Sequence, residues 1–453
     1  MATLAADTNP LAAAAAPDRP APAAPAADRH EALDVVRGAA LFGILLMNIV
    51  GMGLPHAYYN PLNAGGAEGA NLWAWIIAMV GFEGTQRALF SILFGAGVIL
   101  LTGRLEAAGR TDSADIYMRR NMWLVAFGLF NAYVLLWGGD ILFFYGVIGL
   151  FLFAVRKMAA KALLAAGLAA LLAATAWNVS DTAATLRMHD AHAGAVAARG
   201  SGARLVEEQT KAIESWKERV AERRPSAADQ RREIEERTAG YGSAFLAQAA
   251  ENNEGLASEL FRYFFETIGM MLLGMALFKL GVLTLERPTR LYLAMVAIGY
   301  GLGLAVNIAE VSWIRGHNFS TLAFAQAEAT YDAGRLAMTM GHLGALLLFV
   351  RSGAASPLRR GLASVGRMAF TNYLTHSAIA LVLFVGFGLF GQLERHQLFY
   401  IVFAIWAFQL VASTLWLRRY RFGPLEWLWR YLTYLERPPF RRSDGAAAAA
   451  VPA

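Results

Sequence analysis

The chain has 453 residues, of which 57% are hydrophobic and only 16% are charged, and it contains no cysteine. Soluble domains carry about 25% charged residues, so this composition excludes an ordinary soluble protein. The formal net charge of +6 lies mostly beside the apolar blocks, which indicates membrane topology and not nucleic-acid binding. The absence of cysteine excludes disulfides and thiolate chemistry.

The predicted fold is an all-α polytopic membrane protein. Its apolar blocks are about 20 residues long, enough to cross a hydrocarbon core of about 30 Å. The second block begins with an interfacial helix at about 71–82. The ten blocks lie at 33–54, 72–102, 119–137, 141–155, 159–177, 258–280, 289–309, 333–351, 368–390 and 397–417.

Five regions follow from these blocks. Residues 1–30 form an Ala/Pro-rich tail that is expected to be disordered, because it lacks the apolar stretch of a signal peptide. Two transmembrane bundles of about five helices each occupy 31–177 and 258–420. Between them, 178–257 is a polar, partly helical loop, and 421–453 is an interfacial helix followed by a disordered tail.

Arginine and lysine mark alternate short connections. The connection 103–120 holds four arginines, whereas 53–70 and 137–140 hold no lysine or arginine. Because positive residues stay on the cytoplasmic side, this alternation predicts ten spans with both termini in the cytoplasm. The loop 178–257 is then periplasmic, where we expect it to cap that face. The expected location is the inner membrane of a bacterium.

The first block carries an unusual set of polar residues. Asp34 and Arg37 are three positions apart, and Asn48 returns to nearly the same helical angle. Pro55 and His56 end the block at its predicted periplasmic side. Ionisable residues within spans usually face a bundle interior or an aqueous cavity. The alternative is an interfacial ion pair, a packing asparagine and a loop histidine.

Further candidate residues lie in later blocks, each with a structural alternative. Glu83 and Arg87 have the spacing of a helical ion pair, either a substrate site or a salt bridge between helices. Asp140 is either catalytic or an N-cap for the next helix. The eighth and ninth blocks add Arg335, His342, Arg367, Asn372 and His376, of which Asn372 and His376 share a helical face. His189 and His192 lack a third ligand nearby, so no metal site is expected.

These segments together resemble the DUF418 (YeiB-like) family of bacterial membrane proteins. The resemblance is carried by residues 33–48, with Asp34-Val35-Val36-Arg37-Gly38, and by 82–95, 365–374 and 421–430. It covers nearly the whole chain outside the tails and the loop 178–257.

The opening Asp34-x-x-Arg37-Gly38, Asn48 and His56 is also similar to that of the transmembrane acyltransferase superfamily. That superfamily includes heparan-α-glucosaminide N-acetyltransferase and the acyltransferase-3 type enzymes. The resemblance implies transfer of an acyl group, such as acetyl, from cytoplasmic acyl-CoA to a periplasmic or cell-envelope acceptor such as a glycan. By position, His56 matches the histidine that acts in catalysis in that superfamily. The near-neutral pKa of histidine suits it to acyl transfer. Asp140 is the second catalytic candidate.

The remaining candidates would bind the substrate or the acyl-CoA co-substrate: Asp34, Arg37, Asn48, Glu83, Arg87, Arg335, His342, Arg367, Asn372 and His376. Two other functions remain open from the residues. In a transporter or permease for a small polar or anionic solute, the same charges would line its path. In a scaffold they would form structural ion pairs. The expected partners are the lipid bilayer and a small-molecule or glycan acceptor, with no nucleic acid. The sequence leaves open whether the chain forms a homodimer.

Overall fold

The computed structural model describes residues 26–55, 60–202 and 204–442. Within these ranges the secondary structure is helical and contains no named β-strand, which confirms the all-α prediction. His56 and most of the predicted N-terminal tail lie outside the described residues, as does the end of the C-terminal tail.

The first half of the chain forms six helices in the described residues. They are α1 (Ala26–Gly53), α2 (Gly69–Gly81), α3 (Thr85–Ala107), α4 (Ser113–Tyr133), α5 (Leu142–Val155) and α6 (Ala160–Gly200). The predicted interfacial helix is α2, which a short turn separates from α3.

The second half contains the remaining helices. They are α7 (Glu207–Arg223), α8 (Ala227–Thr238), α9 (Tyr241–Lys279), α10 (Thr289–Gly316), α11 (Thr321–Glu328), α12 (Tyr331–Ser352), α13 (Ser356–Arg367), α14 (Ala369–Ala380), the π-helical η1 (Leu381–Gly386), α15 (Arg395–Arg419) and α16 (Pro424–Tyr434). The predicted ninth block is therefore α14 continued by η1.

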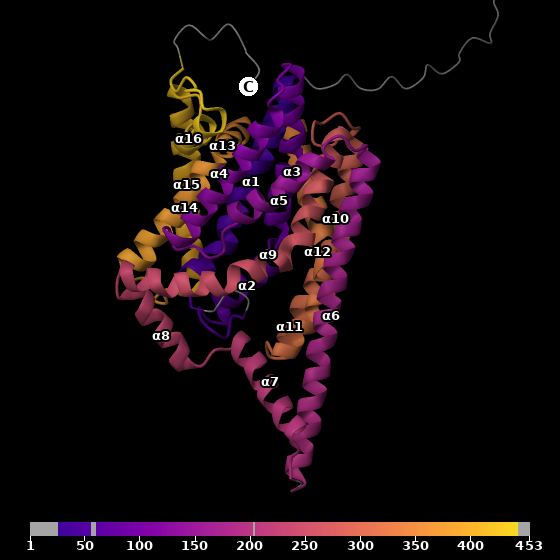
Figure 1. Cartoon of the computed structure of the whole chain (residues 1–453), viewed down its shortest axis with the longest axis vertical. Coiled ribbons are helices and arrows are strands. Elements are labelled where there is room, and N and C mark those ends of the chain that lie inside the picture. Colours follow the sequence, from indigo (N-terminus) through magenta and orange to yellow (C-terminus); the bar gives the residue numbers. More distant parts are fainter. Residues whose placement is uncertain (1–25, 56–59, 203, 443–453) are drawn as a thin grey trace, which may run out of the picture.

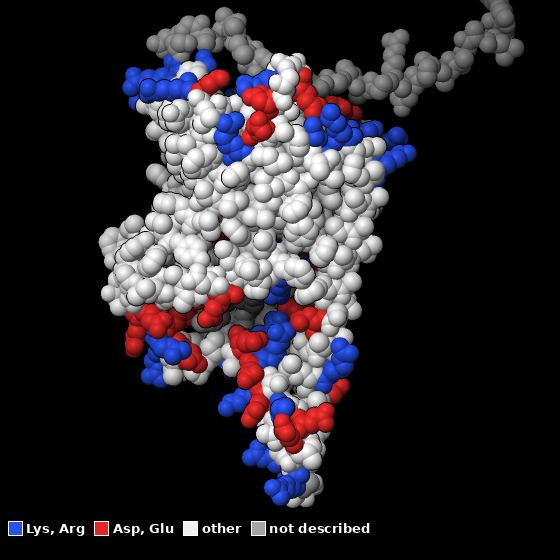
Figure 2. Space-filling model, in the orientation of Figure 1, with Lys and Arg blue, Asp and Glu red and all other residues white. Residues whose placement is uncertain are grey.

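The chain is a multi-pass membrane protein by the length and composition of its helices. Eight helical segments in the described part of the chain are long and apolar enough to cross a membrane. The helices α4 and α5 occupy the other two predicted blocks. Figure 2 shows charged side chains gathered at the two ends of the molecule, with an almost uncharged band between them. Such a band is the surface that lipid requires.

Two faces can be defined from Figure 1. The termini face, at the top of the view, carries α13, α16 and both ends of the described chain. The opposite face carries α7, α8 and α11. Each end is held by a neighbouring helix: Glu31 accepts a hydrogen bond from Arg359 of α13 at 2.7 Å, and Arg442 N donates to O of Arg419, the last residue of α15, at 3.0 Å.

Helices run through most of the region 178–257, which was predicted as a polar, partly helical loop. α6 has 41 residues, about 60 Å at 1.5 Å per residue, or twice the thickness of the hydrocarbon core. α9 has 39 residues. The apolar pattern ends near residue 177, but an Ala-rich sequence without proline continues the helix beyond it. Figure 1 shows α6 extending past the other helices, with α7 beside its end.

The two predicted bundles share one hydrophobic core. A single cluster of buried residues draws on α1, α3, α5, α9, α12 and α14. α1 lies near its centre, and 78% of its apolar window is buried. It packs backbone to backbone on α13: a Cβ on Gly38 would overlap the Leu362 carbonyl, and one on Gly366 would overlap the Asp34 carbonyl. Small residues permit this close approach of helices in membranes.

Candidate functional site

The turn between α2 and α3 begins a buried ionic cluster. Glu83 lies in that turn and is 5% exposed, and its Oε1 accepts a hydrogen bond from the Tyr331 hydroxyl at 2.9 Å. Gly84 follows in the left-handed conformation with φ of 66°. A Cβ there would overlap the Arg335 side chain, so glycine is required for both backbone and space.

The cluster continues across three helices. Arg335 of α12 is 2% exposed, and its Nη2 donates to Asp332 Oδ1 at 2.6 Å and lies 3.2 Å from Glu266 Oε2 of α9. Arg87 of α3 donates to the same Glu266 at 3.1 Å. We call Glu83, Arg87, Glu266, Asp332 and Arg335 the buried ionic cluster.

The predicted helical spacing of Glu83 and Arg87 is wrong. α3 begins at Thr85, after a left-handed Gly84, so Glu83 lies before the helix and not one turn along it. Arg87 instead reaches across to Glu266, which the sequence analysis had not singled out. A charge pair does join two helices, but it is formed by Arg87 of α3 and Glu266 of α9 and not by the predicted residues.

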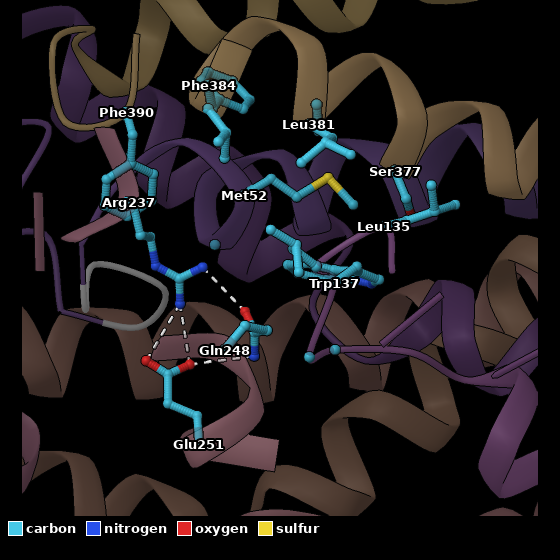
Figure 3. Close-up of a pocket in the computed structure, with 16 residues that line it drawn as sticks. Met52, Leu135, Trp137, Arg237, Gln248, Glu251, Ser377, Leu381, Phe384 and Phe390 are labelled. Carbon is cyan, nitrogen blue, oxygen red and sulfur yellow. Dashed lines mark hydrogen bonds and ion pairs between the residues drawn. The ribbon is translucent and has the colours of Figure 1, made fainter. Parts of the chain in front are cut away.

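The main cavity lies at the end of α1 and has a volume of about 230 Å³. Figure 3 shows Met52 of α1, Phe384 and Leu381 of η1 and Phe390 forming its apolar wall. Leu135 adds to this wall from the α4–α5 connection. Small-molecule sites combine apolar walls of this kind with a few placed polar groups.

One polar edge of the main cavity comes from the region between the two bundles. Arg237, at the end of α8, donates to Gln248 Oε1 at 3.0 Å and to Glu251 Oε2 at 3.0 Å, both on α9. Figure 3 shows this trio along the edge of the cavity opposite Ser377. The guanidinium also lies over the Phe390 ring, 5.3 Å from its centroid.

One further polar group of the main cavity has no hydrogen-bond partner. The Ser377 hydroxyl of α14 is buried and unpaired. Ser377 is 1% exposed. Buried polar groups are normally hydrogen-bonded, so unpaired donors that line a cavity are suited to a bound ligand.

Asp140 follows Gly139, which lines the main cavity. Its Oδ2 accepts a hydrogen bond from Phe143 N at 2.8 Å, and its Oδ1 accepts from Asn131 Nδ2 at 2.8 Å. Tyr373 of α14 lies 3.4 Å from the same Oδ1. The carboxylate satisfies an amide in the first turn of α5 from the position just before the N-cap residue Ile141, which is a capping contact close to the N-cap predicted as the alternative to a catalytic role.

Asn372 and His376 share a face of α14, as predicted, and both contact α15. His376 Nε2 lies 3.0 Å from Gln409 Oε1, and Gln409 Nε2 donates to Asn372 O at 3.1 Å. Asn372 Nδ2 donates to Ser413 Oγ at 3.0 Å. This row of polar residues ends beside Ser377, so α14 carries buried polar groups up to the main cavity.

His342 contacts neighbouring helices on both sides of its ring. Its Nε2 lies 2.7 Å from Gly81 O, and its Nδ1 lies 3.0 Å from the Tyr300 hydroxyl. In α6, His189 and His192 pack against Trp216 of α7. No group of three or more metal-ligating side chains occurs among the described residues.

At the termini face, Arg37 Nη1 donates to Asp34 Oδ1 at 2.7 Å, confirming this pair. The same nitrogen lies 3.5 Å from Gly366 O of α13. Arg367 is the last residue of α13 and donates to Arg421 O at 3.4 Å. Asn48 is half-buried and lies about 20 Å further along α1 from Asp34.

Glu426 lies in the segment 421–430, which carries part of the family resemblance, and it has a structural contact. Its Oε1 accepts hydrogen bonds from Phe370 N at 2.8 Å and Thr371 N at 3.0 Å, and its Oε2 accepts from the Thr371 hydroxyl. The carboxylate of α16 therefore caps the first turn of α14. Burial raises the pKa of Glu426 above its ordinary value.

The structure distributes the predicted residues over several places. Arg37, Asp34 and Arg367 lie at the termini face, Asn372 and His376 between α14 and α15, and Glu83, Arg87 and Arg335 in the buried ionic cluster. Sequence reasoning missed Glu266, Asp332, Arg237 and Glu251. A lone carboxylate inside the apolar run Phe264-Phe265-Glu266 would have been the signal for Glu266.

Comparisons with known proteins agree with this architecture. Residues 277–436 match the family described as "Protein of unknown function (DUF418)". The chain is 30% identical to the uncharacterized protein YeiB of Escherichia coli (strain K12) over 418 residues, covering 90% of this chain and 96% of that protein. It is 28% identical to the uncharacterized protein YxaH of Bacillus subtilis (strain 168) over 446 residues, covering 92% and 96%. No solved structure matches it. By its similarity to YeiB over nearly the full length of both proteins, the chain belongs to the DUF418 (YeiB-like) family of membrane proteins.

Proposed function

We propose that this protein is an acyltransferase of the bacterial inner membrane. It would move an acyl group, such as acetyl, from cytoplasmic acyl-CoA to an acceptor on the other side, such as a glycan. The observation that carries the proposal is the main cavity at the end of α1. It combines an apolar wall with an unpaired hydroxyl at Ser377, as a site for an acceptor or an acyl chain requires.

The chemistry needs a base at that cavity. His56 follows Met52, which lines the cavity, by four positions in the chain. In the proposed step His56 takes the proton of an acceptor hydroxyl or amine, and the acceptor atom forms a bond to the thioester carbonyl carbon. The carbon–sulfur bond then breaks, and the CoA thiolate that leaves takes up a proton. Histidine suits this role because its pKa is close to neutral.

Arginines at the termini face support entry of the donor there. Arg37 and Arg367 lie at this face, and Arg120 stacks over Trp429 at 3.6 Å from the ring centroid. Guanidinium groups bind phosphates through paired hydrogen bonds. The positive-inside rule assigns this face to the cytoplasm, where acyl-CoA is present.

A transporter for a small polar or anionic solute is the second candidate. The observation that favours it is the buried ionic cluster, which lies where the α2–α3 segment is broken. Charges buried within a bundle commonly mark a solute or proton path.

The deciding experiment measures release of free CoA thiol by the purified full-length protein in lipid nanodiscs supplied with acetyl-CoA and a glycan acceptor. We expect turnover by wild type and a loss of about 10²- to 10⁴-fold in His56→Ala, the usual contribution of a general base. His317→Ala, which changes an exposed histidine, is the matched control. Absence of both acetyl-CoA binding and turnover in wild type would refute the acyltransferase. Solute uptake by proteoliposomes would then support the transporter.

A further inference from the structure

The buried ionic cluster contains more acids than bases. Arg335 contacts Asp332 and Glu266, and Arg87 contacts Glu266. With Glu83 the cluster holds three carboxylates and two guanidinium groups. In a bundle interior an excess carboxylate is costly unless it is paired or neutralised. Glu83 is the carboxylate furthest from a direct ion pair, since the hydrogen bond that it accepts comes from the Tyr331 hydroxyl.

A small cavity lies beside Glu83. Its volume of about 20 Å³ is enough for a single water molecule. Glu83 Oε2 is buried without a hydrogen-bond partner, and so are Arg335 Nε and Nη1. Both residues line the cavity, and both are more than nine-tenths buried. Unpaired buried atoms around a water-sized space indicate a site for an exchangeable polar species.

A second carboxylate lines the same cavity from the side of α10. Glu310 accepts a hydrogen bond from the Thr330 hydroxyl at 2.5 Å. It is partly exposed, whereas Glu83 is 5% exposed. Asn307, one turn before it on α10, completes the polar lining and donates to Val80 O at 2.8 Å. The cavity therefore connects a carboxylate at the edge of the bundle to one inside it.

We propose that Glu83 is a proton-binding group of the membrane domain, supplied through the small cavity by Glu310. A hydronium ion in the cavity, or the protonated Glu310, gives its proton to Glu83 Oε2. An O–H bond forms on Glu83, and a water molecule or the Glu310 carboxylate is left behind. Protonation removes the excess negative charge, and the new O–H replaces the missing hydrogen bond at Oε2.

Charged groups from every neighbouring helix influence this equilibrium. Arg87 of α3 and Arg335 of α12 favour the ionised form of Glu83, whereas Glu266 of α9 and burial favour the protonated form. Tyr331 hydrogen-bonds the other oxygen, Oε1. Proton uptake is expected to be reversible because both arginines keep their carboxylate partners at Glu266 and Asp332.

The test is infrared difference spectroscopy of the full-length protein in lipid nanodiscs, titrated with acid and base. A protonated buried carboxyl group gives a C=O stretching band that moves in heavy water. We expect such a band in wild type and its loss in Glu83→Gln, which mimics the protonated side chain. Glu310→Gln should keep the band but slow its appearance after a pH jump by at least about tenfold. Glu218→Gln, at an exposed glutamate of α7, is the control.

Two outcomes would overturn the proposal. If the titrating band is the same in wild type and in a folded Glu83→Gln variant, with folding checked by thermal unfolding, Glu83 does not bind the proton. If sodium ions at constant pH stabilise wild type and not Glu83→Gln, the site binds a metal cation and not a proton. Neither outcome depends on acetyl-CoA turnover, so this inference stands or falls separately from the proposed acyltransferase.

Discussion

Arg335 of α12 lies with its Nη2 3.2 Å from Glu266 Oε2 of α9, and both side chains are buried. Glu266 also accepts a hydrogen bond from Arg87 of α3. One carboxylate therefore joins three helices that are distant in the sequence. A buried ion pair adds little net stability to the folded protein, but removing one partner is strongly destabilising because the other charge is left buried and unpaired.

Glu266→Ala should reduce the free energy of unfolding by about 3–5 kcal/mol, because it leaves buried guanidinium groups short of a carboxylate. Unfolding by denaturant in mixed micelles measures this. Glu106→Ala is the matched control, since its contact with Arg156 at 3.2 Å is exposed and should contribute at most about 1 kcal/mol. Equal effects of the two substitutions would contradict a structural role for the cluster.

Gly84→Ala should destabilise the protein by about 1–3 kcal/mol, because alanine is strained at φ of 66°. Its Cβ would also displace Arg335 from the buried ionic cluster. Gly97→Ala on the same α3 has open space around its Cβ and should be neutral or stabilising by up to about 1 kcal/mol. Thermal unfolding in detergent distinguishes the two, and an unchanged Gly84→Ala would show that the turn is not strained.

Gly38→Ala should separate α1 from α13, because the added Cβ overlaps a backbone carbonyl that no side-chain movement can relieve. Overpacking of this kind costs about 1–3 kcal/mol. Gly301→Ala on α10, where no atom lies within 4 Å of the new Cβ, is the control. The yield of folded protein in size-exclusion chromatography measures the effect, and equal yields would exclude tight packing at Gly38.

Ser377→Ala should leave stability unchanged or slightly higher, since it removes a buried hydroxyl with no partner. Thr339→Ala is the contrast, because its hydroxyl donates to Arg335 O at 2.7 Å and its loss should cost about 1 kcal/mol. Thermal unfolding of both variants tests this pair. If Ser377→Ala is as destabilising as Thr339→Ala, the hydroxyl serves the fold and not a ligand of the main cavity.

Glu426 should make stability depend on pH. Its folded-state pKa is raised by burial, so the folded protein binds its proton more tightly than the unfolded chain. The stability it contributes is present below the ordinary glutamate pKa and is lost as pH rises through the raised value. Unfolding across this range should show the slope in wild type and a smaller one in Glu426→Gln. A slope that persists unchanged in the variant would assign it to another group.

The sequence by itself determined the membrane class, the ten apolar blocks and the family. Each follows from composition, block length or local motifs. These are properties of stretches of about 20 residues, and they can be read without knowing which residues are in contact. The sequence also predicted the pairing of Asp34 with Arg37, the shared face of Asn372 and His376, and a capping contact of Asp140 with the next helix. Their spacing of three or four residues fixes the geometry locally.

Only the tertiary structure decided which distant residues meet. Arg87 pairs with Glu266 of α9. Glu83 is not on the same helix as Arg87, because α3 begins only after the left-handed Gly84. The carboxylate that Arg87 meets therefore depends on how α3 packs on α9. The main cavity likewise arises where α1, η1, α8 and α9 leave space. Arg237 and Gln248 come to it from the region 178–257, which the sequence predicted as a polar, partly helical loop without placing it against the other helices. Hydrophobic burial is not directional, so an apolar pattern does not specify which helices meet. These contacts are set by close packing and hydrogen-bond geometry between segments that are distant in the sequence.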